Sequence, residues 1–194
     1  MTTASLTRPT TAIPAGSWEL DPVRSALEFE VRKLGFVAIK GRVPGFSGTL
    51  VGGDEPRLAG SVDARTITTF DAERDGHLQA PDFFDIDRHP TLTFASTTFE
   101  TDGDELVVHG DLTIRGVTRP VELRGSLTGT GSDPWGNERL GLELAGTVDR
   151  TEFGLEWNAP LPGAGFLLPN EGRRRASRPA GTPGSRCASS RGGR

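Results

Sequence analysis

Residues 25–33 read Ser-Ala-Leu-Glu-Phe-Glu-Val-Arg-Lys. Within this stretch Leu27, Phe29 and Val31 alternate with charged side chains, so apolar and polar groups fall on opposite sides of an extended chain. A period of two residues is typical of a β-strand with one buried face. The sequence therefore predicts a half-buried strand at this position.

The same alternation recurs along most of the chain. It is found in residues 37–51, 57–67, 91–95, 105–115, 121–127 and 140–144. Turn-forming residues separate these segments, among them Gly52-Gly53-Asp54 and Asp102-Gly103-Asp104. Many short strands joined by turns predict an all-β sandwich or barrel. Glycines inside several segments favour the barrel, because glycine lets a strand bend sharply.

One segment lacks the alternation and predicts the single helix of the chain. Residues 71–79 begin with acidic side chains, which suit the positive end of a helix dipole, and Pro81 follows. We therefore expect one short helix near 71–79. Residues 1–16, rich in Thr, Pro and Ala, predict a disordered leader before a domain that begins at residue 17.

Composition narrows the range of functions. The chain has 194 residues and a formal net charge of -4, and residues 172–194 contain arginines but no acidic residue, so residues 1–171 are more acidic than the whole. An acidic body argues against binding to nucleic acid. The only cysteine, Cys187, excludes an internal disulfide. We find neither a signal peptide nor a transmembrane segment, and we expect a cytoplasmic protein.

Motifs for metal, cofactor or nucleophilic chemistry are lacking in the sequence. His77, His89 and His109 have no zinc-motif spacing, and there is no Gly-x-Ser-x-Gly elbow, P-loop or dinucleotide fingerprint. We therefore predict no catalytic residues, no bound metal and no cofactor. His77 is expected to form a local hydrogen bond, and His109 is expected to face outward.

Four separated blocks of residues suggest a family. They are Trp18-x-Leu20-Asp21; Arg74-Asp75-x-His77-Leu78 followed by Phe83-Phe84-Asp85; Gly110-x-x-Thr113-x-x-Gly116-x-Thr118-x-Pro120-Val121; and Asp149-Arg150-x-x-Phe153-Gly154-x-x-Trp157. With these blocks, in this order, the chain resembles the YceI-like family of polyisoprenoid-binding proteins from about Trp18 to about Glu171. The resemblance implies a YceI-like domain at residues 17–171, folded as an eight-stranded, lipocalin-like antiparallel β-barrel.

The resemblance also implies an elongated apolar cavity for a long lipid. From the alternation alone, the inward apolar side chains are most simply a packed core; the resemblance favours a lining role instead. The candidate lining residues are Leu27, Phe29, Val31, Phe36, Val43, Phe46, Val62, Phe83, Phe84, Phe94, Leu112, Ile114, Leu142 and Trp157.

The function expected from this resemblance is to bind, and to carry or sequester, a long apolar lipid. The ligand would be a polyisoprenoid, an isoprenoid quinone or a fatty-acid derivative, and the protein would not be an enzyme. One alternative is an enzyme that acts on a hydrophobic substrate in the same barrel. Another is a stress-response or assembly module whose barrel is filled by side chains. We also expect a homodimer.

The chain departs from the family pattern in two places. Arg24 and Lys33 stand where the family often has histidine. Beyond Glu171 the family continues with an apolar strand that closes the barrel, whereas residues 172–194 are rich in Arg, Gly and Pro and predict disorder. Two interpretations stay open: a frameshifted or truncated gene that lacks the last strand, or a genuine basic tail on a barrel closed in another way.

Overall fold

Strands account for more than half of the residues that the structure describes. The computed structural model describes residues 13–34, 37–102, 104–158, 168 and 185–187. The strands are β1 (Gly16–Glu19), β2 (Glu28–Lys33), β3 (Val37–Arg42), β4 (Phe46–Gly52), β5 (Arg57–Asp63), β6 (Thr91–Asp102), β7 (Glu105–Ile114), β8 (Val117–Ser132), β9 (Glu138–Gly146) and β10 (Ser185–Cys187). The helices are α1 (Ala72–Gln79) and the 3-10 turns η1 (Ala64–Thr66) and η2 (Arg150–Phe153).

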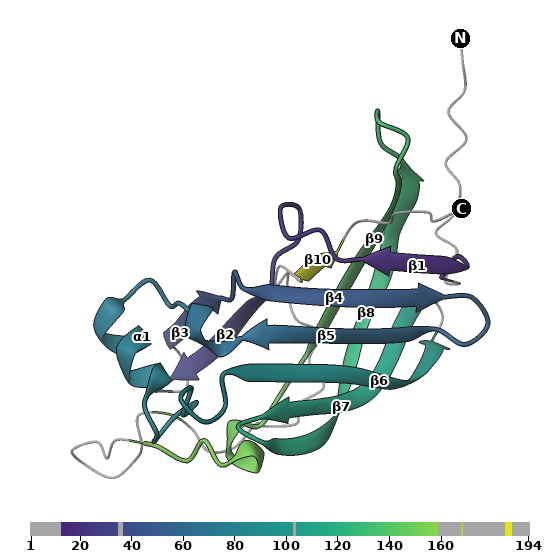
Figure 1. Ribbon diagram of the computed structural model, residues 1–194. Helices are drawn as coiled ribbons and strands as arrows, with labels where there is room; N and C mark the ends of the chain where they lie inside the picture. The colour runs from purple at the N-terminus through teal and green to yellow at the C-terminus, as the bar shows by residue number, and fades with distance from the viewer. Residues whose placement is uncertain (1–12, 35–36, 103, 159–167, 169–184, 188–194) are drawn as a thin grey trace.

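The strands form a nearly closed antiparallel barrel. Eight of them make one sheet in the order β1-β4-β5-β6-β7-β8-β9-β10, and β2 pairs with β3 in a separate hairpin. In Figure 1 strands β4 to β7 cross the front of the molecule and β8 and β9 cross behind them, so the sheet curls around an interior. The predicted all-β barrel is therefore confirmed. Its strand count differs from the expected eight-stranded barrel, because β10 is only three residues long and β2 and β3 stand apart from the main sheet.

The described residues extend beyond both predicted ends of the domain. Ile13, in the segment expected to be a disordered leader, is only 4% exposed and packs in the core. Within the expected disordered tail, the structure describes Ser185–Cys187, which pair with Leu142–Leu144 of β9. The described part of the chain thus begins before residue 17 and includes three residues of the predicted tail.

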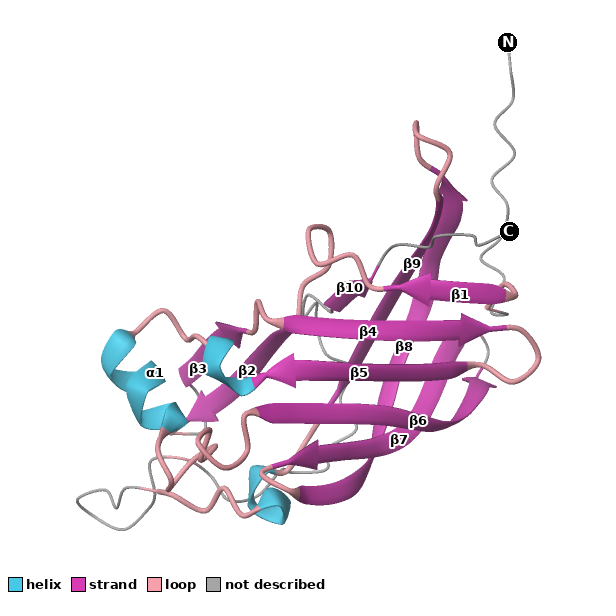
Figure 2. Ribbon diagram, viewed as in Figure 1, coloured by secondary structure: helices cyan, strands magenta, loops and turns pink. Residues whose placement is uncertain are grey.

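The predicted helix is confirmed at Ala72–Gln79. The side chain of Asp71 caps its N-terminus by accepting a hydrogen bond from the backbone N–H of Arg74 at 3.1 Å. Leu78 packs against the buried cluster that includes Val43 and Ile67, which holds the helix at one end of the barrel. Figure 2 shows α1 beside the β2–β3 hairpin at this end. Among the described residues, no helix is both long and apolar enough to span a bilayer.

The buried core is divided between the two ends of the barrel. The first cluster contains Ile13, Trp18, Leu50, Leu106, Leu127, Leu140 and Leu142. The second cluster contains Val43, Ala64 and Ile67, and the third contains Ile114, Phe153 and Leu155. Phe84 and Leu92 contact both the second and the third cluster, so these two together fill the end that α1 covers.

Candidate functional site

The pairing of the strands identifies the side chains that point into the barrel. Directly opposite residues of an antiparallel pair lie on the same face of the sheet. Gly48 lies opposite Gly60, and Gly60 lies opposite Phe94. Farther along the sheet, Gly110 lies between its partners Ser96 and Val121. We call these six residues the middle band.

The middle band lies on the inner face, between the packed ends. Gly48 alternates with Leu50 of the first cluster along β4, and Gly60 alternates with Val62, which packs on the second cluster. None of the six described residues belongs to any of the three clusters. Three of them are glycines, and Phe94, Ser96 and Val121 are only half-buried. Side chains therefore fill the barrel tightly at both ends and sparsely in between.

The groups of the band that could oppose an apolar ligand are already satisfied. The Ser96 hydroxyl accepts a hydrogen bond from the backbone N–H of Leu58 at 2.7 Å. The ring of Phe94 lies over Gly110, where a Cβ would come within 2.5 Å of the Phe94 Cζ atom. The band thus offers an aromatic face, backbone and the methyl groups of Val121, a surface suited to an apolar ligand.

Most of the predicted lining residues pack against one another. Leu27, Phe29, Val43, Val62 and Phe84 belong to or contact the second cluster; Leu112 and Ile114 belong to or contact the third; and Leu142 belongs to the first. Phe46 is half-buried opposite Val62, and Phe94 is the one predicted residue that falls in the middle band. These side chains are brought together mainly as core, and whether they also contact a ligand stays a prediction.

One predicted lining residue is exposed, and another is not described by the structure. Val31 is 36% exposed and lies in the β2–β3 hairpin, which is not part of the main sheet. Phe36 lies outside the described residues. Conversely, five residues of the middle band were not among the predicted lining residues: Gly48, Gly60, Ser96, Gly110 and Val121. The in-strand glycines were the available signal, but only the register shows that Gly48 and Gly60 face each other.

Phe83, Trp157 and His77 form a ring cluster beside α1. The ring centroids of Phe83 and Trp157 are 5.2 Å apart, and the His77 ring meets both edge-on at 5.0 and 4.7 Å. His77 Nε2 forms a 2.8 Å hydrogen bond with Asp82, as the sequence predicted, and this bond holds the pKa of the Asp82 carboxyl below its usual value. Phe83 is buried, so the cluster packs α1 against Phe83 and Trp157, and whether these two rings also contact a ligand stays a prediction.

Arg150 lies at the start of η2. Its Nη1 donates hydrogen bonds to the backbone carbonyls of Leu155 and Trp157, the second at 2.9 Å. Burial lowers the pKa of this guanidinium from its ordinary value. Arg150 therefore shapes the chain that follows η2.

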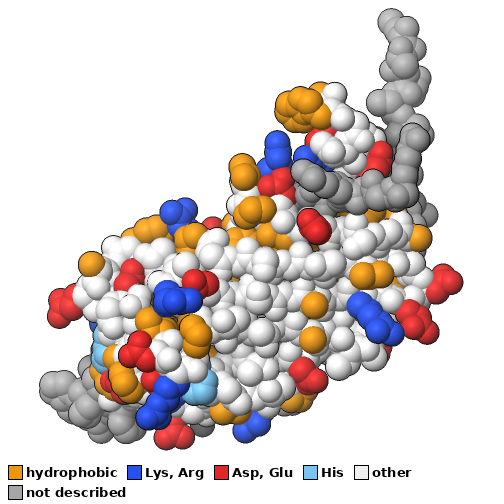
Figure 3. All heavy atoms as spheres, viewed as in Figure 1, with side chains coloured by type: hydrophobic (Ala, Val, Ile, Leu, Met, Phe, Trp, Pro, Cys, Tyr) orange, Lys and Arg blue, Asp and Glu red, His pale blue; other side chains and the backbone are white. Residues whose placement is uncertain are grey.

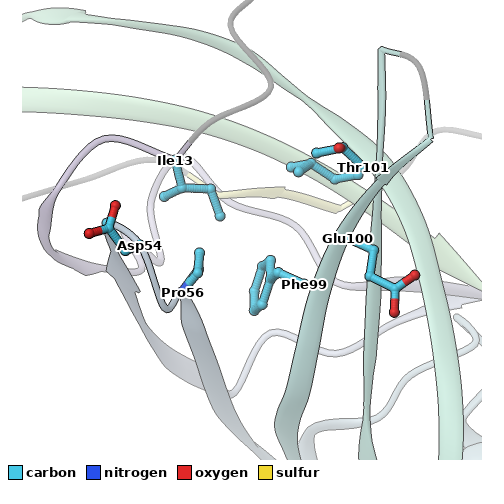
Figure 4. A pocket seen from close by; sticks show the side chains of 8 residues that line it. Ile13, Asp54, Pro56, Phe99, Glu100 and Thr101 are labelled. Carbon is cyan, nitrogen blue, oxygen red and sulfur yellow. The ribbon is translucent and has the colours of Figure 1, made fainter.

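Two pockets are found in the described part of the structure, one outside the middle band and one at its edge. A cavity of about 170 Å³ opens at the rim of the barrel, where Ile13, Pro56 and Phe99 converge and Asp54 and Glu100 point away (Figure 4). Ligand pockets usually measure roughly 300–1,000 Å³, so this one is too small for a long lipid. A more open hollow of about 460 Å³ lies over β4 and β5 and includes Gly48 and Gly60 in its wall. No group of three or more potential metal-binding side chains is found in the described parts of the chain.

A comparison with family models identifies the family. The model for the YceI-like domain matches residues 18–171. The chain belongs to the YceI-like family. This confirms the resemblance based on the four sequence blocks, over almost the same residues.

Curated relatives and solved structures agree with this assignment to the YceI-like family. A UPF0312 protein of Pectobacterium atrosepticum is 37% identical over 133 residues, 66% of this chain and 69% of the relative. Protein YceI of Escherichia coli O157:H7 is 37% identical over 134 residues, 67% of this chain and 70% of the relative.

Among solved structures, the YceI protein of Campylobacter jejuni has a TM-score of 0.58 at 27% identity, over 70% of this chain and 82% of that one. A polyisoprenoid-binding domain from Saccharophagus degradans has a TM-score of 0.53 at 19% identity, over 72% of this chain and 81% of that one. The second likeness shows the fold alone.

Proposed function

We propose that the protein binds a long apolar lipid along the inner face of its barrel. The ligand would be a polyisoprenoid, an isoprenoid quinone or a fatty-acid derivative, which the protein carries or sequesters without chemical change. The observation that supports this most directly is the middle band, where the inner face between two packed ends has small or half-buried side chains and satisfied polar groups.

The energetics and the relatives are consistent with this proposal. Each buried methylene of a ligand contributes about 0.8 kcal/mol, so an apolar chain gains affinity without specific polar contacts. The Saccharophagus degradans domain, described as polyisoprenoid binding, shares the fold. The alternative of an enzyme would need titratable groups at the inner face. Of the two candidates that the sequence offers, His77 is hydrogen-bonded to Asp82, and Asp85 is 7% exposed.

The direct test is to identify what the purified protein contains. Extraction with organic solvent followed by mass spectrometry is expected to release an isoprenoid or long acyl species. Added polyprenyl or acyl fluorescent probes should also be taken up. An empty extract together with no probe uptake would exclude lipid binding.

A pair of variants locates the site. Val121→Trp places a large ring in the middle band and should weaken probe uptake at least tenfold, because it fills the space that the ligand would occupy. Glu122→Trp is the matched control, since Glu122 is the exposed next residue of β8 and points to the other face. Fluorescence titration measures the probe uptake of both variants, and circular dichroism verifies that both are folded. Equal uptake by the two variants would place the ligand elsewhere.

A further inference from the structure

Two apolar side chains project from one corner of the molecule. Val23, in the loop after β1, is 86% exposed, and Trp135, at the tip of the β8–β9 hairpin, is 76% exposed. These are the highest exposures among the large apolar residues that the structure describes. The β8–β9 hairpin extends beyond the body of the barrel, and hydrophobic atoms occupy its tip (Figures 1 and 3).

Hydrogen bonds hold the turn beneath each of these side chains. Asp133 Oδ1 accepts from the backbone N–H of Trp135 at 3.0 Å and from that of Asn137 at 2.9 Å. Asp21 Oδ1 accepts from the backbone N–H of Val23 at 2.9 Å. A carboxylate therefore fixes the backbone of both turns, and both apolar side chains lie on turns held by hydrogen bonds.

Arg139 joins the two turns. Its guanidinium donates to Asp133 Oδ2 at 2.6 Å and to Asp21 Oδ2 at 3.3 Å. All three side chains are at most about one quarter exposed, with values of 24% for Arg139, 11% for Asp133 and 10% for Asp21. Val23 and Trp135 thus lie in turns that are joined by ion pairs, which keep the two side chains near each other. We call the ion-paired residues Asp21, Arg24, Asp133 and Arg139 the frame.

The frame has no net charge of its own. Arg24 forms a second ion pair with Asp21 at 2.8 Å, so the guanidinium groups of Arg24 and Arg139 balance the carboxylates of Asp21 and Asp133. The chain as a whole is acidic, with a net charge of -4. An anionic surface would repel such a protein, whereas a zwitterionic surface would not.

The shape of this corner suits a bilayer better than a protein partner. A stable protein interface buries about 800 Å² on each side, far more than two side chains on a projecting tip provide. A bilayer needs no complementary surface, and the amphipathic ring of tryptophan is favourable at its headgroup region. The tip also stands near the edges of the sheet, where β1 pairs only with β4 and β9 meets β10 over three residues of the described chain.

We propose that Trp135 and Val23 insert into the headgroup region of a zwitterionic bilayer and dock the open edge of the barrel on the membrane. Docking there would let an apolar ligand move between bilayer and barrel without crossing water. The ligand-transfer part rests on the proposed function; the docking itself does not.

Vesicle binding tests the docking. The full chain, mixed with phosphatidylcholine vesicles, should float with them, and its tryptophan emission should shift to the blue and be quenched by lipids brominated near the headgroup. Trp135→Ser, and the double variant Val23→Ser/Trp135→Ser, should lose at least tenfold in vesicle affinity. Phe70→Ser is the matched control, because Phe70 is 70% exposed near α1 and lies outside the frame; it should bind as the native chain does.

Three outcomes would overturn the docking proposal. They are no flotation of the native chain, equal flotation of the Trp135→Ser variant, and flotation with anionic vesicles alone. Lipid uptake is measured separately, with a probe delivered from cyclodextrin. The double variant should take up this probe normally yet receive it from vesicles at least tenfold more slowly. Vesicle binding without any uptake would contradict the proposed function while leaving the docking intact.

Discussion

Gly110 lies in the middle of β7 and makes room for a neighbouring ring. A Cβ at this position would come within 2.5 Å of the Phe94 Cζ atom and within 2.6 Å of the Ala95 carbonyl oxygen. Gly76 is in the opposite situation, because it lies within α1 and a Cβ there would meet nothing within 4 Å. The same amino acid therefore has opposite effects on stability at the two positions.

Two alanine substitutions should separate these effects. Gly110→Ala is expected to lower the free energy of unfolding by about 1–3 kcal/mol, since both the ring and the backbone would have to move. Gly76→Ala should raise it by roughly 0.5–1 kcal/mol, because alanine loses less backbone entropy in a helix. Urea unfolding followed by circular dichroism measures both. A neutral Gly110→Ala would show that Phe94 moves away without cost and that the middle band is looser than described.

The β8–β9 hairpin depends at its tip on one carboxylate. Asp133 accepts hydrogen bonds from Asn137 and from Arg139, and these bonds hold the pKa of its carboxyl well below the usual value. At Asp21, burial alone would raise the pKa, but the hydrogen bond from Arg24 and backbone N–H groups outweigh it and the pKa is lowered as well. A lowered pKa means that the folded hairpin favours the ionised form of each group.

The hairpin should therefore become less stable in acid. The contribution of Asp133 is fully present above its unfolded pKa of about 4 and is lost as the pH falls toward its lower folded value. Unfolding by urea at about pH 5 and about pH 2.5 should show a larger loss for the native chain than for Asp133→Asn, which has no carboxyl to protonate. If the two chains lost the same stability, Asp133 would not be the group responsible.

At the scale of the whole molecule, the barrel is packed at its ends and sparsely filled in its middle. The first cluster joins Ile13, which precedes β1, to β8 and β9, while the second and third join α1 and η2 to the other end. Two separate cores can hold the strands in place while the inner face between them keeps accessible apolar surface. An apolar ligand would bind to that part of the inner face.

A bound lipid should accordingly stabilise the entire domain. A ligand that binds only the folded state at 100 times its dissociation constant adds about 2.7 kcal/mol to the free energy of unfolding. Thermal unfolding of the solvent-extracted and the reloaded protein should therefore differ in midpoint by several degrees. The Val121→Trp variant should show little or no such shift. An equal shift in both would mean that the lipid stabilises the protein from outside the barrel.

Much of the fold was predictable because it depends on local pattern. The alternation at Leu27 and Phe29 predicted a strand, and the acidic start of residues 71–79 predicted α1, because side-chain period and helix capping act over a few neighbouring residues. The part of the fold before β1 was harder to predict from the sequence. Nothing near Ile13 in the sequence shows that it belongs to the same buried cluster as Leu106 and Leu140, more than ninety residues away in the chain.

The candidate site was predictable only in part. Phe94 was included on the basis of its alternation, but the glycines that face it carry no such signal, and Val31 was included although the β2–β3 hairpin leaves it exposed. The alternation predicts which side chains of a strand are buried, but it does not predict which residues of other strands they face. The Asp21–Arg139 contact, which joins residues 118 positions apart, was likewise not foreseeable.

The amino-acid sequence by itself determined the class of fold, the place of the helix and the family, because these follow from the spacing of residue types along the chain. The tertiary structure alone decided which apolar side chains form core and which leave space, and which turns meet through Arg139. Those outcomes depend on strand register and curvature, which bring distant residues face to face and which no local pattern encodes.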